Sequence, residues 1–215
     1  NAAGRLGDAK TSLEFLLETD SFKANERAIE LLNINNTRKD MTEQGTKTAI
    51  GLIETSDHLL MGAVPETGVA ALSDRVLVMY IPKLHESLVG IIAGRIKERY
   101  YRPVLLFTDS EEEGIIKGSG RSIEGYNMYD EINKCSDYFT KFGGHEMAAG
   151  FSMEKRNLAR LREKMNANCT LDEKLLTPKL RIDVPMPLDY VTIPLTEELE
   201  VLEPFGKGNE KPVFA

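Results

Sequence analysis

Residues 75–107 read RVLVMYIPKLHESLVGIIAGRIKERYYRPVLLF, and this stretch gives the strongest indication of the fold. It opens with an unbroken apolar run at 76–81, which is typical of a strand buried on both faces of a sheet. Apolar residues then recur at helical spacing from Val89 through Tyr100, and strand composition returns at 103–107. Together the three segments predict a β-α-β unit within an α/β fold.

The residues that follow this unit continue the α/β pattern. Three consecutive glutamates within 109–114 indicate a solvated turn, and Ile115–Lys117 leads as a strand into a glycine-containing loop. The other expected elements are a helix at 129–136 with Asn127 as its cap, a small-residue strand at 148–151 and an amphipathic helix at about 155–169. We therefore expect a mixed β-sheet flanked by helices.

The chain before this domain is expected to form a helical connecting arm. Leucines recur at helical spacing within 8–19, and Ser21 is a candidate N-cap for a long polar-faced helix. A further helix is expected at about 46–56, while residues 57–74 have the composition of a loop or a short irregular element.

The chain after the domain is predicted to begin another unit. Residues 180–184 alternate like a half-exposed strand, and Thr196 is expected to cap a short helix that precedes a turn at 204–209. These changes in pattern divide the chain into three expected parts, which are residues 1–56, 57–170 and 171–215.

Composition limits the classes of protein and of site. The net charge of −7 and the pI near 5.2 mean that any contact with nucleic acid requires a local basic surface. Cys135 and Cys169 are far apart and have no metal-ligand spacing, so buried free thiols are expected. No apolar run reaches the roughly 18 residues of a membrane span, and no signal-peptide pattern is present, which predicts a cytoplasmic protein. Because the chain lacks an initiating Met, we expect it to be part of a longer protein.

Two glycine-containing segments combine accessible backbone with cationic or protonatable side chains. They are KGSGRS at 117–122 and KFGGH at 141–145. Glycine lets a phosphate oxygen approach main-chain N–H groups, and an arginine such as Arg121 offers a planar fork of donors to two phosphate oxygens. Neither segment matches GxxxxGK[ST] or GxGxxG, so a phosphodiester is a better candidate ligand than ATP or a dinucleotide. Each segment alone is also compatible with an ordinary turn.

The histidines leave alternatives open. His145 can donate to a phosphate oxygen or can simply cap the next element, and no second ligand at helical or hairpin spacing favours a metal there. His85 and Ser87 lie between a strand and a helix, where either can cap the helix and where the helix N-terminus attracts anions. A Ser-His-Asp hydrolase is not supported, because the sequence has no GxSxG elbow.

Five stretches resemble the bacterial RecJ family, in the same order and with matching spacing. They read LHESLVGIIAGR at 84–95, KGSGRSIEG at 117–125, KFGGHEMAAG at 141–150, NAAGRLG at 1–7 and PFGKGNEKPVF at 204–214. The resemblance covers nearly the whole chain. It implies that the chain starts at the end of an Asp-His-His phosphoesterase domain, continues through the α/β domain associated with it and enters an oligonucleotide-binding fold.

The resemblance also implies a function. RecJ proteins are 5′-to-3′ exonucleases that hydrolyse single-stranded DNA in repair and recombination, with a Mn²⁺ or Mg²⁺ centre in the Asp-His-His domain. By this resemblance the chain grips the strand, holds no metal itself and does not cleave alone, and its partners are single-stranded DNA and either an ssDNA-binding protein or a helicase. The implied site residues are His145 for phosphate stabilisation and Arg5, His85, Ser119, Gly120, Arg121, Ser122, Gly143 and Gly144 for substrate binding.

Two other functions stay open from the sequence. A relative in the same superfamily would act on short oligonucleotides or cyclic dinucleotides, although the stretch at 204–214 argues against it. A non-catalytic module would bind single-stranded DNA without ever working with a metal domain. Asp-rich metal motifs in the coding sequence before Asn1 would distinguish the nuclease from this module.

Overall fold

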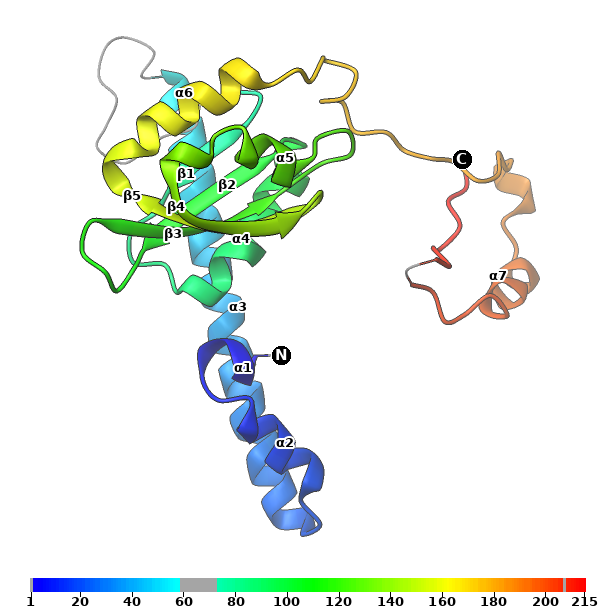
Figure 1. Cartoon of the computed structure of the whole chain (residues 1–215). Helices are drawn as coiled ribbons and strands as arrows, with labels where there is room; N and C mark the ends of the chain where they lie inside the picture. The colour runs from blue at the N-terminus through cyan, green and yellow to red at the C-terminus, as the bar shows by residue number, and fades with distance from the viewer. Residues whose placement is uncertain (1, 59–72, 207) are drawn as a thin grey trace. The chain divides into compact units, whose positions relative to one another are not determined.

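In the computed structural model, which describes residues 2–58, 73–206 and 208–215, a five-stranded mixed sheet forms the centre of the first of two units (Figure 1). The strand order is β1-β2-β3-β5-β4. β1 and β2 pair in parallel and are joined by α4 (Glu86–Tyr100), which confirms the β-α-β unit, and the other neighbours pair antiparallel. The strands are β1 (Leu77–Tyr80), β2 (Val104–Asp109), β3 (Ile115–Arg121), β4 (Phe139–His145) and β5 (Ala148–Glu154).

Helices cover both faces of β1 and β2, and this explains their continuous apolar composition. On one face, α4 and α3 (Ser21–His58) pack over side chains that include Leu77 and Met79. On the other face, α6 (Leu158–Asn168) packs over β1, from which Val78 and Tyr80 enter a second core, and α5 (Met128–Asn133) closes this core over β4 and β5 (Figure 1). Successive residues of a strand point to opposite faces, so each residue of β1 enters one of the two cores.

The arm is built on α3, which is a single helix of 38 residues. The expected separate helix at 46–56 is therefore wrong, because the chain stays helical through Gly45. Gly45 is buried where α3 packs against α4, and a Cβ there would lie 2.5 Å from Cδ1 of Ile92, so its absence lets the two helices approach closely. Among the helices of the described residues, none is both long enough and apolar enough to cross a membrane.

Both ends of α3 differ from the expectation. At its start, the carboxylate of Asp20 accepts hydrogen bonds from the backbone N–H groups of Phe22 and Lys23, at 2.9 and 3.1 Å, so Asp20 rather than Ser21 is the cap. At its end, α3 extends to His58. The rest of the loop expected at 57–74 lies for the most part outside the described residues. Upstream, α1 (Ala3–Leu6) and α2 (Lys10–Leu17) pack against α3.

The two glycine segments lie in strands, and this corrects the loops expected there. Lys117–Arg121 belongs to β3, and residues 141–145 belong to β4. β3 pairs with β2 on one side and with β5 on the other, so its amides take part in the sheet and do not form a phosphate-binding loop. Packing requires Gly118 to be glycine, because a Cβ there would overlap the ring of Phe151 and the carbonyl oxygen of Leu106.

The remaining elements of the first unit follow the sequence more closely. The side chain of Asn127 accepts a hydrogen bond from Asp130 N at 3.2 Å, which confirms it as the cap of α5. The helix expected at 129–136 ends earlier, at Asn133, and a 3-10 turn follows at Ser136–Tyr138. Likewise, the helix expected at 155–169 begins as a 3-10 turn at Lys155–Asn157 and continues as α6.

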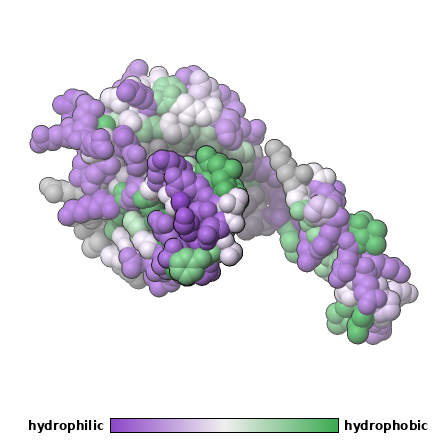
Figure 2. Space-filling view, turned by 90° about the horizontal axis from the view of Figure 1, so that it is seen from below, coloured by the Kyte–Doolittle hydropathy of each residue, from purple (hydrophilic) through white to green (hydrophobic). Residues whose placement is uncertain are grey.

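The second unit, Pro178–Ala215, has little regular structure. The strand expected at 180–184 is reduced to one bridge between Val184 and Phe214. Its helix α7 (Ile193–Glu200) is capped by the Thr192 hydroxyl, which accepts from Leu195 N at 3.4 Å, and not by Thr196. Several large apolar side chains are exposed on this unit, where Figure 2 shows hydrophobic patches among hydrophilic ones.

Replacing Gly118 by valine should lower the free energy of unfolding by about 1–3 kcal/mol, because the new side chain meets Phe151 and backbone in a filled core. The matched control is Gly143→Val on β4, where a Cβ would meet nothing within 4 Å. Urea unfolding of both variants measures the difference. Equal stability of the two variants would contradict the packing explanation, since valine is otherwise favourable in strands.

Candidate nucleic-acid interface

Side chains alternate along β3, and one set of them faces away from the core beneath α5 and α6. Gly118 and Gly120 face that core, where a Cβ at Gly120 would lie 3.1 Å from the sulfur of Met128. Lys117, Ser119 and Arg121 therefore point to the opposite face, on which α4 lies. On this face β3 thus presents two cationic side chains with a hydroxyl between them.

The next two strands extend this face with small residues. Opposite Ser119 lie Gly150 of β5 and then Gly143 of β4. A Cβ built at Gly143 or Gly150 would meet nothing within 4 Å, so the surface there is open. We call this surface the open face, and its residues are Lys117, Ser119, Arg121, Lys141, Gly143, His145, Ala148, Gly150 and Ser152.

Arg121 is the half-buried cation of the open face. Its Nη1 donates to Ser119 Oγ and to the Gly120 carbonyl oxygen, both at 2.7 Å, which holds the guanidinium against its own strand. Burial and, second, repulsion from Arg5 lower the pKa of Arg121, although a guanidinium stays charged at neutral pH. Neither arginine forms an ion pair with a carboxylate in the part of the chain that the structure describes.

Arg5 reaches this region from the other end of the chain. Its Nη1 donates to the Ser87 carbonyl oxygen at 3.0 Å, and the Ser87 hydroxyl donates to the Arg5 carbonyl oxygen at 2.7 Å. The Ser87 hydroxyl also lies 2.8 Å from His85 Nδ1. These reciprocal contacts fix α1 against the first turn of α4 and bring Arg5, His85 and Arg121 into one neighbourhood.

The loop before α4 is held by side chains of β2, and this places His85. Lys83 has a positive φ of 58°, and its N–H donates to the Asp109 carboxylate at 2.8 Å. The Leu84 N–H donates to the Thr108 hydroxyl at 3.0 Å. The hydrogen bond from the Tyr80 hydroxyl to Asp109 is the main cause that lowers the pKa of this carboxyl group. His85 occupies the N-cap position of α4 but does not cap its amides, so its exposed ring is available to a ligand.

His145 lies at the end of β4, at the edge of the open face. Its Nδ1 accepts a hydrogen bond from Met147 N at 3.3 Å, and this contact assigns the proton of the neutral ring to Nε2. The ring is exposed and lies opposite Ala148, which is too small to cover it. His145 is therefore positioned to donate to an anion on this face.

Three of the expected site residues have a packing role in the structure. Ser122 is buried, and its hydroxyl donates to the Tyr126 carbonyl oxygen at 2.5 Å, so it stabilises the turn after β3. Gly120 faces the core at Met128. A Cβ at Gly144 would overlap Ala149, so close approach of β4 and β5 explains that glycine.

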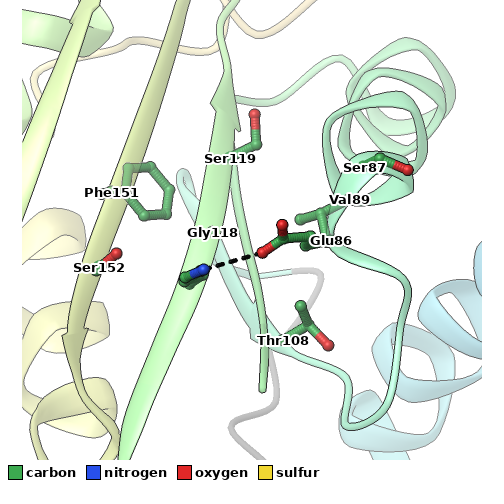
Figure 3. Close-up of a pocket in the computed structure, with 9 residues that line it drawn as sticks. Glu86, Ser87, Val89, Thr108, Gly118, Ser119, Phe151 and Ser152 are labelled. Atoms are coloured by element: carbon green, nitrogen blue, oxygen red, sulfur yellow. Dashed lines mark hydrogen bonds and ion pairs between the residues drawn. The ribbon is translucent and has the colours of Figure 1, made fainter. Parts of the chain in front are cut away.

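A cavity of about 280 Å³ lies between the first turn of α4 and β3 (Figure 3). Glu86 reaches from α4 to Lys117 of β3, with 3.1 Å between Oε2 and Nζ. The hydroxyl-bearing residues that line the cavity are Ser87, Thr108, Ser119 and Ser152. Glu86, Lys117 and Ser152 are not among the site residues expected from the sequence, although alternation along a strand at 117–121 would place Lys117 on the same face as Arg121.

Metal ligands do not gather at this surface. Among residues 2–58, 73–206 and 208–215, no group of three or more His, Cys, Asp or Glu side chains is arranged to hold a metal ion. The face therefore offers cationic, hydroxyl and imidazole donors, which suit the oxygens of a phosphate.

Comparisons with known proteins agree on one family. The DHHA1 domain family matches residues 73–170, and the RecJ OB domain family matches residues 182–215. The single-stranded-DNA-specific exonuclease RecJ of Bacillus subtilis is 33% identical over 99% of this chain and 25% of its own length. The protein of the same name from Escherichia coli is 35% identical over 100% of this chain and 36% of its own length.

Solved structures give the same result for the fold. The crystal structure of RecJ in complex with Mg²⁺ from Thermus thermophilus matches with a TM-score of 0.74 and 28% identity, over 100% of this chain and 31% of that chain. This chain thus spans between 25% and 36% of the length of these relatives. The matched fold, the order of the matched domains and the end-to-end similarity agree, and the chain belongs to the RecJ family, of which it carries the DHHA1 domain and OB-domain sequence.

Proposed function

We propose that this chain binds single-stranded DNA along the open face, as the strand-gripping part of a 5′-to-3′ exonuclease that acts in DNA repair and recombination. The observation that carries the proposal is the pair formed by Arg5 and Arg121. Two guanidinium groups that repel each other, one of them half-buried, have no carboxylate to neutralise them among the described residues. A phosphate group would supply the missing negative charge and accept charge-assisted hydrogen bonds from both.

The surroundings of the two arginines favour a strand over a small anion. Ser119 adds a hydroxyl beside Arg121, and His145 adds a donor at the far edge of the same face. The glycines between them leave room for the backbone of a nucleic acid to lie across β3, β5 and β4. The relatives are called single-stranded-DNA-specific exonucleases, which supports an unpaired strand as the ligand.

Hydrolysis is assigned to residues outside this chain. The related structures contain Mg²⁺ or Mn²⁺, and such an ion would activate water in the intact enzyme. The residues of this chain bind the phosphates, orient the strand and stabilise its negative charge, with Arg5, His85, Ser119, Arg121, Gly143 and His145 as the proposed contacts. The chain alone is expected to bind DNA without cleaving it.

The proposal also assigns domains to the chain and a location and partners to the intact enzyme. We assign residues 1–56 to the end of the phosphoesterase domain and the connecting arm, 57–170 to the DHHA1 domain and 171–215 to a linker and the OB domain. The family matches at 73–170 and 182–215 support this division. The enzyme would work in the cytoplasm on strands supplied by a helicase or by an ssDNA-binding protein.

Replacing Arg121 by alanine should weaken binding of 5′-phosphorylated single-stranded DNA roughly 10- to 150-fold, because a charge-assisted hydrogen bond contributes about 1.5–3 kcal/mol. The slope of log affinity against log salt should become shallower by about 0.7, the value for one phosphate contact on a single strand. Fluorescence anisotropy over a range of salt concentrations measures both. Arg160→Ala, which removes the same charge from the exposed side of α6, is the control, and an equal loss in both variants would refute the proposed site.

Replacing Gly90 by alanine should weaken DNA binding while leaving the protein at least as stable. A Cβ at Gly90 would lie 2.5 Å from Nη2 of Arg121, so it would displace the guanidinium, which is the end of a flexible side chain. Alanine is otherwise better than glycine within a helix by up to about 1 kcal/mol. Gly94→Ala, one turn later in α4, is the matched control because its Cβ would meet nothing within 4 Å. Thermal unfolding and anisotropy together test this, and unchanged binding by Gly90→Ala would show that the position of Arg121 does not matter.

A further inference from the structure

The two ends of β3 differ in how their cations are neutralised. At one end, Arg121 has no carboxylate partner in the described chain. At the other end, Lys117 forms an ion pair with Glu86, which comes from the first turn of α4 and not from the sheet (Figure 3). Glu86 raises the pKa of Lys117 through this hydrogen bond and through its charge, and Glu111 adds to the effect, so the ammonium group stays protonated.

Lys117 lies in a row of side chains that are suited to a phosphate. By strand register, Ser152 of β5 lies directly opposite Lys117, and Lys141 of β4 lies opposite Ser152. The Ser152 hydroxyl and the Lys141 ammonium group make no hydrogen bond or ion pair within the residues that the structure describes. Two lysines and one serine thus share a row beside the cavity of about 280 Å³ that Glu86 also lines.

The ion pair itself can be exchanged for another anion. The side chains of Lys117 and Glu86 are 42% and 63% exposed, and ion pairs this exposed contribute little to stability. A carboxylate resembles a phosphate in its negative charge and in its oxygen acceptors. Glu86 therefore occupies, from within the chain, a position at which an external phosphate would find the same partner.

We propose that Lys117, Ser152 and Lys141 form a second phosphate subsite, and that Glu86 fills it as a built-in phosphate mimic until a DNA strand displaces it. The inference rests on the proposed binding of DNA to the open face. Lys117 and Arg121 are four residues apart on β3, or about 13 Å between Cα atoms, so the two subsites take different phosphates of one strand. Glu86 thereby competes with any phosphate that enters the Lys117 subsite and leaves the Arg121 subsite open.

The test is the Glu86→Gln variant of this chain, assayed with 5′-phosphorylated oligodeoxynucleotides by anisotropy at several salt concentrations. Affinity should rise about 2- to 5-fold, which is the range expected for release of an exposed ion pair. Adding Lys117→Gln should cancel the gain. A series of oligonucleotides, each with one neutral methylphosphonate linkage at a different position, locates the two phosphates. One position should abolish the affinity gain of Glu86→Gln, and a different position should weaken binding as Arg121→Ala does.

The matched control is Glu43→Gln, which removes the same charge from another exposed ion pair, with Lys47 on α3 at 2.7 Å. Equal gains in the Glu86 and Glu43 variants, or no gain in the Glu86 variant, would overturn the second subsite and leave the proposed function standing. If the wild-type chain binds DNA without any dependence on Arg121, or does not bind it, the proposed function fails and the subsite fails with it. Thermal unfolding of each variant separates these outcomes from loss of the fold.

Discussion

Burial of β1 and β2 between two layers of helices is the constraint on which the rest of the structure depends. A parallel pair of strands needs a crossover, and α4 supplies it while it covers the sheet on one face together with α3. α4 packs chiefly over β2 and β3, and residues of β4 and β5 on the same face, such as Gly143, His145 and Gly150, remain exposed. The open face thus combines residues of β4 and β5 that lie beyond α4 with Lys117, Ser119 and Arg121 of β3, which are half-buried beside this helix.

Residues of α4 position the cationic side chains of the open face. Gly90 brings the helix close enough for Arg121 and Ser119 to lie against it, and the first turn of α4 supplies Ser87, which holds Arg5. A chain of net charge −7 thus presents uncompensated positive charge where packing, and not overall composition, has gathered it. Lys117 differs from Arg121 because it forms an ion pair with Glu86, so neighbouring cations on the same face differ in whether a carboxylate neutralises them.

Much of the fold could be predicted from the sequence, because its signals are local. The apolar run at 76–81, the helical spacing that follows it and the Asn127 cap all depend on neighbours within a few residues. The family could also be predicted, since its motifs are contiguous stretches. The errors occur at glycines whose role depends on a distant contact: Gly45 lies within a helix where Ile92 leaves no room for a Cβ, and Gly118 lies within a strand where Phe151 leaves none.

Residue type and short-range spacing were enough to predict an α/β domain and to select Arg121 and His145 as candidate phosphate ligands, and the structure places both residues on the open face. The packing contacts of Ser122, Gly120 and Gly144, and the meeting of Lys117, Ser152 and Glu86 beside a cavity, depend on the three-dimensional fold and could not be predicted from the sequence. Strand alternation and register across β3, β5 and β4 determine which side chains share a face, since a shift of one residue would turn every side chain to the other face of the sheet.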